Sequence, residues 1–431
     1  MTAINGNTLK KSAPRRKVSV ALDPVLEELF SESVVAKIWG VAHPATLAPS
    51  PPTTVPDYTA VGGTDYVFAE FDWWTSGFFP GSLFALVERA IKYPEVFPSD
   101  KLNLVKLQFG ATWWAQPVHG QAPRTDTHDI SFMVQPSMQR AHELLGDKAA
   151  YNSMIVAARA LASRYDPKVG AIRSWDQAIN YRYSFTDPAK DFLVIIDNMC
   201  NLRLLYWAAL QTGDLELATI ATKHAETTLA HHIRYPDWSA HHLLVYDAET
   251  GDVKHKLQNQ GLSDDSTWSR GQAWAIMGYA ETYEWTKDPK FLDAAINLGK
   301  YFMSRLPEDG VPHWDFDAPR PTYRDTSAAM AAANGFLIIY QATSDETYLA
   351  DALYLLSSAI KLSLSPRASF LTDKDGNTTD VVDLGGFDTI LKNATINNNP
   401  DAHRKLADTG LVYADYYFIL AGNKLLELGV F

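Results

Sequence analysis

Apolar side chains recur at helical spacing through most of this chain. The segment 193–207 is a clear case, because four of its apolar residues follow at steps of three or four: Ile195, Met199, Leu202 and Tyr206. Asp197 lies in the first turn of the helix that this pattern predicts. Burial beside apolar neighbours raises the pKa of a carboxyl group, whereas a helix N-terminus lowers it. Asp197 is therefore either a helix cap or a carboxyl group with a chemical role.

Short turns divide the chain into similar helical units. Four of them follow an apolar helical segment and open a more amphipathic one: Gly146-Asp147, Gly213-Asp214, Lys287-Asp288 and Ser344-Asp345. They are 67, 74 and 57 residues apart, the size of a helical hairpin with a variable loop. Counting every segment gives about twelve helices, the last at 407–427. Six hairpins predict an all-α fold, an (α/α)6 barrel with inner and outer rings, and an open α-solenoid is the structural alternative.

The N-terminal part follows a looser pattern. Asp23-Pro24 is typical of a helix start and Gly40 of its end, and the Pro-rich stretch 45–56 predicts a loop. Helical patterns follow at 78–92 and 99–116.

Long connections precede several of the apolar helices, at 165–191, 233–266, 307–323 and 364–406. In a barrel of hairpins these loops gather at one end, around the N-termini of the inner helices. One of them contains a predicted β-hairpin at 243–253. Because loops on a rigid scaffold often carry function, we expect a cleft at this end.

Polar side chains stand at the start of the predicted inner helices: His128-Asp129, Asp197, Arg270 within Trp268–Trp274, and Asp325 within Arg324–Ser327. Asp129 and Asp197 are 68 residues apart, and Asp197 and Arg270 are 73 apart, which matches the hairpin repeat. These groups are in phase, so the fold brings them to one rim. Each alone is also an ordinary helix-end residue, whereas a cluster of carboxyl groups in a cleft is a candidate for catalysis.

The same rim carries residues suited to a sugar. Paired carboxyl groups are typical of acid–base chemistry on a glycoside. Three tryptophans are candidates for stacking on sugar rings, although Trp is also a common core residue: Trp74, Trp175 and Trp274. Arg270 is expected to hold a carboxylate through its forked donors, the alternative being an ion pair within the fold. His242 and Gln260 are candidates to line the same cleft.

Composition narrows the class of function. The 431 residues carry a net charge of −12, which argues against nucleic acid as a partner. The single cysteine, Cys200, excludes an internal disulfide framework and is expected to be a packed thiol, and no histidine spacing indicates a metal site. Residues 1–20 are polar and basic, and we expect a disordered lead-in before a single catalytic domain at 21–431. With neither a signal-peptide core nor a membrane span in the sequence, we expect a cytoplasmic protein.

The chain resembles the unsaturated glucuronyl hydrolases, glycoside hydrolase family 88, from about residue 73 to residue 418. Five stretches carry the resemblance: Trp74-Thr75-Ser76-Gly77-Phe78, His128-Asp129-Ile130, Ile195-Ile196-Asp197-Asn198-Met199, Ser263 to Trp274, and Tyr413-Ala414-Asp415-Tyr416-Tyr417. The resemblance implies an (α/α)6 barrel that removes a 4,5-unsaturated uronic acid from the non-reducing end of lyase-generated oligosaccharides. It implies hydration of the C4=C5 vinyl ether, with no metal or organic cofactor.

By the same resemblance, Asp197 matches the catalytic acid/base and Asp129 the second essential carboxyl group. Seven positions match the sugar pocket of the family: Trp74, His128, Trp175, His242, Gln260, Arg270 and Trp274. We expect Asp197 to start protonated and Asp129 to stay ionised. The loop 176–190 is longer than usual, and Lys392-Asn393-Ala394 differs from the stretch that binds sulfated sugars in some members.

Several alternatives remain open. An unsaturated rhamnogalacturonyl hydrolase has the same barrel and chemistry but acts on pectin fragments. A sugar epimerase on a similar barrel generally works through histidines. A helical scaffold or sugar-binding protein does no chemistry, and it would leave the conjugated double bond of an unsaturated disaccharide, and its ultraviolet absorbance, intact.

Overall fold

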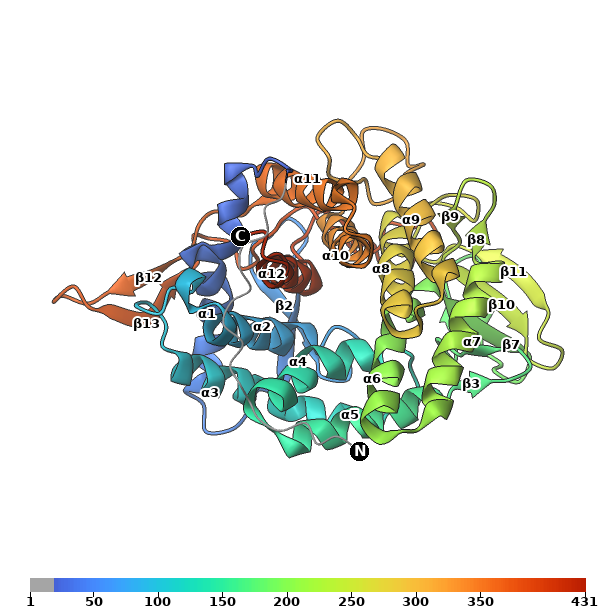
Figure 1. The fold of residues 1–431 in the computed structure, drawn as a ribbon, viewed down its shortest axis with the longest axis horizontal. Coiled ribbons are helices and arrows are strands. Elements are labelled where there is room, and N and C mark those ends of the chain that lie inside the picture. The colour runs from blue at the N-terminus through green and yellow to red at the C-terminus, as the bar shows by residue number, and fades with distance from the viewer. Residues whose placement is uncertain (1–18) are drawn as a thin grey trace.

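Two concentric rings of α-helices make up the fold (Figure 1). The computed structural model describes residues 19–431, so the disordered lead-in predicted at residues 1–20 lies outside the described residues except for its last two positions. Within that range the inner ring has six helices: α2 (Phe78–Lys92), α4 (Ile130–Leu145), α6 (Leu202–Thr212), α8 (Ser269–Thr286), α10 (Thr326–Thr343) and α12 (Val412–Glu427). Neighbouring inner helices contact one another, and α12 meets α2, which closes the ring.

The outer ring surrounds these helices. Its members in the described part of the chain are α3 (Leu104–Ala115), α5 (Lys148–Ala162), α7 (Leu215–His231), α9 (Pro289–Ser304), α11 (Glu346–Ser363) and α1 (Glu32–Thr46). Each of the outer helices α3, α5, α7, α9 and α11 packs on the inner helix that precedes it in the chain. Helix α1 and the 3-10 helix η1 (Pro24–Phe30) fill the space beside α2, α11 and α12. This closed circle confirms the predicted (α/α)6 barrel and excludes an open solenoid.

Helix capping explains the sequence repeat. Four of the six inner helices in the described residues, α4, α6, α8 and α10, end at a residue with a left-handed backbone, with φ of 70° at Gly146, 77° at Gly213, 56° at Lys287 and 58° at Ser344. The aspartate that follows accepts a backbone N–H at the start of the next outer helix, and these aspartates are Asp147, Asp214, Asp288 and Asp345. All four predicted turns are therefore confirmed.

The inner helices are buried on almost every side. Residues 326–340 of α10 and 269–282 of α8 are buried without interruption. A Cβ on Gly278 would lie 2.4 Å from the Cβ of Met199, so this glycine lets the chain after Asp197 pack directly against α8. Among residues 19–431, no helix is long and apolar enough to cross a membrane.

Short antiparallel strands occupy the connecting loops. They are β1 (Thr54–Thr59), β2 (Tyr66–Glu70), β3 (Tyr165–Asp166), β4 (Ala171–Ile172), β5 (Ala178–Ile179), β6 (Ser184–Phe185), β7 (Asp191–Ile195), β8 (Ile233–Arg234), β9 (Ser239–Ala240), β10 (Leu243–Asp247), β11 (Val253–Leu257), β12 (Ser369–Thr372) and β13 (Thr378–Asp383). Three further 3-10 helices are η2 (Pro94–Val96), η3 (Gln116–Gln121) and η4 (Ile196–Asn201). The predicted hairpin is confirmed as β10–β11, and β7 pairs with β10 to form a three-stranded sheet.

Several predicted boundaries are wrong. Asp23 caps η1, and α1 runs through Gly40, where a Cβ would lie 2.8 Å from Leu384 Cδ2. Gly40 therefore serves close packing rather than helix termination. Residues 193–195 belong to β7 rather than to a helix. The helices predicted from residues 99 and 407 begin at Leu104 and Val412.

The long loops meet at one end of the barrel, as predicted. The backbone N–H of His128 bonds to the carbonyl of Ser174 (3.1 Å), and the N–H of Ile196 bonds to the carbonyl of His242 (3.0 Å). The N–H of Thr326 likewise bonds to the carbonyl of Asn393 (3.1 Å). Each bond joins the start of an inner helix to another loop, so the N-terminal ends of these helices share one rim.

Candidate active site

Asp129 occupies the N-cap position of α4 but does not cap it. No backbone N–H within residues 19–431 bonds to its carboxylate. Instead, Asn201 Oδ1 accepts the N–H of Phe132 in the first turn of α4 (3.2 Å). The Asp129 carboxylate accepts a bond from Thr127 Oγ1 (3.1 Å) and lies 3.3 Å from His128 Nε2. Because Asn201 does the capping, the Asp129 carboxyl group is available for other chemistry.

Asp197 lies at the junction of β7 and η4. The pairing of Ile195 with Leu243 in the β7–β10 ladder brings the residue before β10, His242, beside Asp197. The Nε2 atom of His242 is 3.7 Å from Asp197 Oδ1. That oxygen is buried and has no hydrogen-bond partner in the described part of the chain, and η4 has no side-chain cap.

Other aspartates in the same kind of position behave differently. Five of them accept backbone N–H bonds at the start of their helices: Asp147, Asp214, Asp288, Asp325 and Asp345. The helix-cap interpretation that the sequence left open for Asp325 therefore holds for that residue. It does not describe Asp129, which is buried, or Asp197, which is half-buried, because neither carboxyl group makes a capping bond in the described structure.

Burial sets the protonation of this pair. Desolvation raises the pKa of Asp197 to about 7, with a further increase from the charge of Asp129 and an opposing effect of Arg270. Desolvation also raises the pKa of Asp129 to about 7, against the hydrogen bond from Thr127. The expectation that Asp129 stays ionised while Asp197 starts protonated is not supported, because desolvation raises the pKa of both groups to about 7. Burial also lowers the pKa of His128 to about 3 and leaves that imidazole neutral.

His242 is held in one tautomer. It is buried, and burial holds its pKa well below the usual range, so the ring is neutral. Its Nδ1 atom accepts the backbone N–H of Asn259 (3.2 Å). We therefore assign the ring hydrogen to Nε2, the atom that faces Asp197.

The predicted tryptophans divide into two groups. Trp175 pairs with Thr127, and its ring lies 6.1 Å from the His242 ring, at the rim beside both aspartates. Trp74 is half-buried against Tyr413. Trp274 is fully buried, and the centre of its ring lies 5.4 Å from that of Phe132. It therefore packs within the core and offers no face to a sugar.

Arg270 is buried and its terminal nitrogens are engaged within the fold. Nη1 donates to Asp325 Oδ2 (2.5 Å) and to the carbonyl of Thr395 (2.6 Å), and Nη2 donates to the carbonyl of Ile396 (2.6 Å). The forked grip on a substrate carboxylate predicted from sequence is therefore wrong for this geometry. Gln260 follows Asn259, and its Oε1 is buried without a hydrogen-bond partner among the described residues.

Known proteins share this fold and much of this sequence. No protein-family model matches the chain. It is 37% identical over 355 residues to the unsaturated glucuronyl hydrolase of Formosa agariphila, covering 81% of this chain and 78% of that protein. It is 34% identical over 243 residues to the unsaturated chondroitin disaccharide hydrolase of Streptococcus pyogenes serotype M1, covering 55% and 59%. A crystal structure of an unsaturated glucuronyl hydrolase specific for heparin aligns with a TM-score of 0.74 and 29% identity, over 93% of this chain and 97% of that one.

The chain belongs to the unsaturated glucuronyl hydrolase family. It is therefore a glycoside hydrolase. Within residues 19–431 no group of three or more His, Cys, Asp or Glu side chains is arranged to hold a metal ion.

Sequence reasoning missed residues that position the site of this glycoside hydrolase. Asn201 frees Asp129 from capping, and Ser174 joins three segments of the rim. Strand β7 was also missed, although the run Leu193-Val194-Ile195-Ile196 is rich in β-branched residues, which is a usable strand signal. Neither Asn201 nor Ser174 carries such a signal, because their roles depend on tertiary contacts.

Ser174→Ala is expected to destabilise the rim. Ser174 is fully buried, and its Oγ accepts the N–H of Ile195 (2.9 Å), two residues before Asp197. Loss of this acceptor leaves a buried N–H unpaired, at a cost of about 1–3 kcal/mol in the free energy of unfolding. Urea denaturation measures the difference. Ser163→Ala is the matched control, because Ser163 Oγ only donates to a helix carbonyl in its own turn (2.7 Å). Equal losses in both variants would contradict a special role for Ser174.

Proposed function

We propose that this glycoside hydrolase removes a 4,5-unsaturated uronic acid from the non-reducing end of lyase-generated oligosaccharides by hydrating the C4=C5 double bond. One observation carries the proposal. Two uncapped carboxyl groups, buried Asp129 and half-buried Asp197 with its buried Oδ1, lie near one another at the rim, with pKa values raised to about 7. A carboxyl group that holds its proton near neutral pH is the general acid that protonation of a carbon requires.

In the proposed reaction Asp197 gives its proton to C4 of the vinyl ether. Positive charge develops at C5 and is shared by the ring oxygen. Water adds at C5 and returns a proton to the Asp197 carboxylate. The hemiketal opens at the bond between C5 and the ring oxygen, and the hemiacetal left at C1 releases the aglycone sugar. No nucleophile attacks C1, so one carboxyl group serves both as acid and as base.

The remaining rim residues are proposed to bind and orient the sugar. Trp175 and Trp74 offer half-buried rings for the sugar faces. Gln260 contributes a buried, unpartnered amide oxygen, as judged over residues 19–431, which can accept a sugar hydroxyl. His128, Arg270 and Trp274 are proposed to support this surface. Asp129 is proposed to orient the attacking water or a sugar hydroxyl.

The proposed domain at 21–431 acts in the cytoplasm on an unsaturated uronide, without a cofactor and without nucleic acid or a membrane as partner. The relatives are named for different substrates, glucuronyl, chondroitin-derived and heparin-derived. The decisive assay is therefore a panel of unsaturated disaccharides from chondroitin, heparin, hyaluronan, gellan, ulvan and pectin, followed by ultraviolet absorbance. Turnover of the pectin fragment alone would favour the rhamnogalacturonyl alternative. Binding without loss of absorbance would indicate a sugar-binding protein.

The pH dependence of kcat/KM should reflect the raised pKa of Asp197. The reaction needs Asp197 protonated, so kcat/KM is expected to fall as the pH rises through about 7. The charge of Asp129 contributes to this raised pKa, and Asp129→Asn removes it. The basic limb of the residual activity should therefore move to lower pH, although the two coupled carboxyl groups titrate as a pair. A basic limb that stays in place or moves to higher pH would contradict the assignment.

A further inference from the structure

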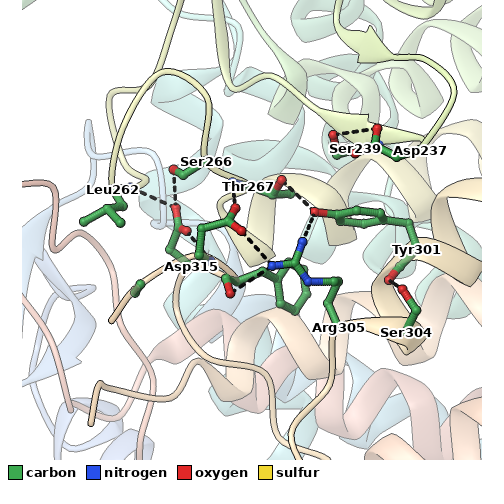
Figure 2. Close-up of polar contacts among 12 residues, drawn as sticks. Asp237, Ser239, Leu262, Ser266, Thr267, Tyr301, Ser304, Arg305 and Asp315 are labelled. Carbon is green, nitrogen blue, oxygen red and sulfur yellow. Dashed lines mark hydrogen bonds and ion pairs between the residues drawn. The ribbon is translucent and has the colours of Figure 1, made fainter. Parts of the chain in front are cut away.

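Asp315 is a fully buried carboxylate that lies outside the set of pocket residues. It lies in the loop between α9 and α10, and Figure 2 shows it with neighbours from the segment before α8, such as Leu262 and Ser266. Its Oδ2 atom accepts the N–H of Leu262 (2.8 Å) and the hydroxyl of Ser266 (2.7 Å), and Oδ1 accepts the N–H of Asp317 (2.9 Å). Three donors converge on one buried carboxylate, which therefore fixes the chain segments that supply them.

One of these segments is the turn 258–262. A Cβ on Gly261 would lie 2.7 Å from Gln258 Oε1 and 2.8 Å from Asp315 Oδ2, so the turn is closed tightly on the carboxylate. The amide of Asn399 donates to the carbonyl of Gly261 (2.6 Å) from the opposite side. The backbone of the turn is thus held between Asp315 and Asn399.

The turn 258–262 also determines the tautomer of His242. The N–H of Asn259, two residues before Gly261, is the donor to His242 Nδ1 (3.2 Å). With Nδ1 occupied as an acceptor, the ring carries its hydrogen on Nε2, 3.7 Å from Asp197 Oδ1. In the other tautomer an Nε2 lone pair would face Asp197 and compete with the substrate for its proton.

We propose that Asp315 is a positioning residue for the hydrolase reaction. It closes the turn 258–262 so that the N–H of Asn259 holds His242 in the tautomer with hydrogen on Nε2. His242 then presents a donor, rather than an acceptor, to the oxygen of Asp197 that lacks a partner within residues 19–431. The proposal rests on the proposed function, because it assigns Asp197 the proton that is transferred.

Two variants disturb this arrangement by different routes. Asp315→Asn replaces one carboxylate oxygen with an NH2 group, which then faces an N–H or O–H donor. Gly261→Ala leaves every charge unchanged but introduces a Cβ against Asp315 and Gln258. Asp317→Asn is the matched control, because the Asp317 carboxylate accepts the N–H of Thr267 (2.9 Å) and a bond from Arg305 (2.7 Å) in the same network, and neither donor belongs to the turn 258–262.

The test measures turnover and the His242 tautomer in the same proteins. In both test variants kcat is expected to fall about 10- to 100-fold, the range typical for residues that orient a reacting group, with KM little changed. Nitrogen-15 spectra of histidine-labelled protein, with the His242 signal assigned by its absence in His242→Gln, should show hydrogen on Nε2 in wild type and control. They should show a changed tautomer or a mixture in Asp315→Asn and Gly261→Ala.

The proposal is overturned if both test variants keep the wild-type tautomer, or if their kcat matches that of Asp317→Asn. If Asp315→Asn does not fold, Gly261→Ala decides alone. The tautomer is read without substrate, so it tests the positioning role even if wild-type protein turns over no unsaturated uronide. That second result would overturn the proposed function instead.

Discussion

Asp197→Asn is expected to reduce kcat on an unsaturated uronide by at least about 10²-fold, because general acid–base groups typically contribute ~10²–10⁴-fold. The asparagine keeps the size of the side chain but cannot deliver a proton to C4. Substrate binding should largely survive, since the shape of the pocket is retained. Single-turnover decay of the ultraviolet absorbance, with enzyme in excess, measures the chemical step directly.

The stability of this variant gives an independent check. The unfolded carboxyl group releases its proton near pH 3.8, whereas the folded one holds it to about pH 7. The folded state therefore binds more protons between these values, so ionisation of Asp197 lowers stability as the pH rises. Asp197→Asn should accordingly have a Tm at pH 7.5 equal to or above that of wild type. Asp345→Asn, at a helix cap on the outer ring, is the control and should keep full turnover. If Asp197→Asn keeps more than about a tenth of wild-type turnover, Asp197 is not the general acid.

Arg270→Ala is expected to lower the free energy of unfolding by about 3–5 kcal/mol, the usual cost of breaking a buried ion pair from one side. Asp325 is fully buried, and the carbonyls of Thr395 and Ile396 lose their donors as well. The guanidinium also lies 4.5 Å from the centre of the Trp268 ring, a contact that alanine removes. Chemical denaturation, with turnover measured below the transition, separates the stability effect from catalysis.

Two further variants decide how Arg270 acts. Lys106→Ala breaks a surface ion pair with Asp380, for which we expect at most about 1 kcal/mol. The double variant Arg270→Met with Asp325→Asn removes the unpaired charge and keeps the cap of α10. It should therefore recover part of the free energy of unfolding that Arg270→Ala loses. If Arg270→Ala unfolds like wild type but loses turnover, Arg270 is a substrate ligand and the buried-pair account is wrong.

The barrel was predictable because its rules are local. A left-handed residue followed by a capping aspartate marks four of the hairpin turns in the described residues, and the pairs are visible in the sequence at Gly146-Asp147 and its repeats. In-phase spacing then placed Asp129 and Asp197 at one rim. Sequence alone could not separate capping from non-capping aspartates, because the deciding residue, Asn201, lies 72 positions from Asp129.

The structure of the loops was not predictable, because it depends on contacts between residues that are distant in the sequence. Strand β7 forms by pairing with β10, about fifty residues later, and its apolar run also fits a helical pattern. The ion-pair partner of Arg270, Asp325, is 55 residues away, and its carbonyl partners Thr395 and Ile396 are more than 120 away. A forked grip on substrate and an internal ion pair were therefore equally compatible with its position in the sequence. The protonation of Asp129 depends on the burial of its own carboxyl group, which only the folded structure specifies.

The order in which the C4=C5 double bond is lost and the aglycone is released tests the claim of hydration most directly. In a single-turnover reaction with an unsaturated disaccharide, loss of the double-bond absorbance and appearance of the free aglycone sugar are followed together by absorbance and quenched-flow mass spectrometry. Hydration at C4=C5 predicts that the double bond disappears before or together with aglycone release, and that Asp197→Asn slows both steps. Release of the aglycone while the double bond persists would show attack at C1 and contradict the account.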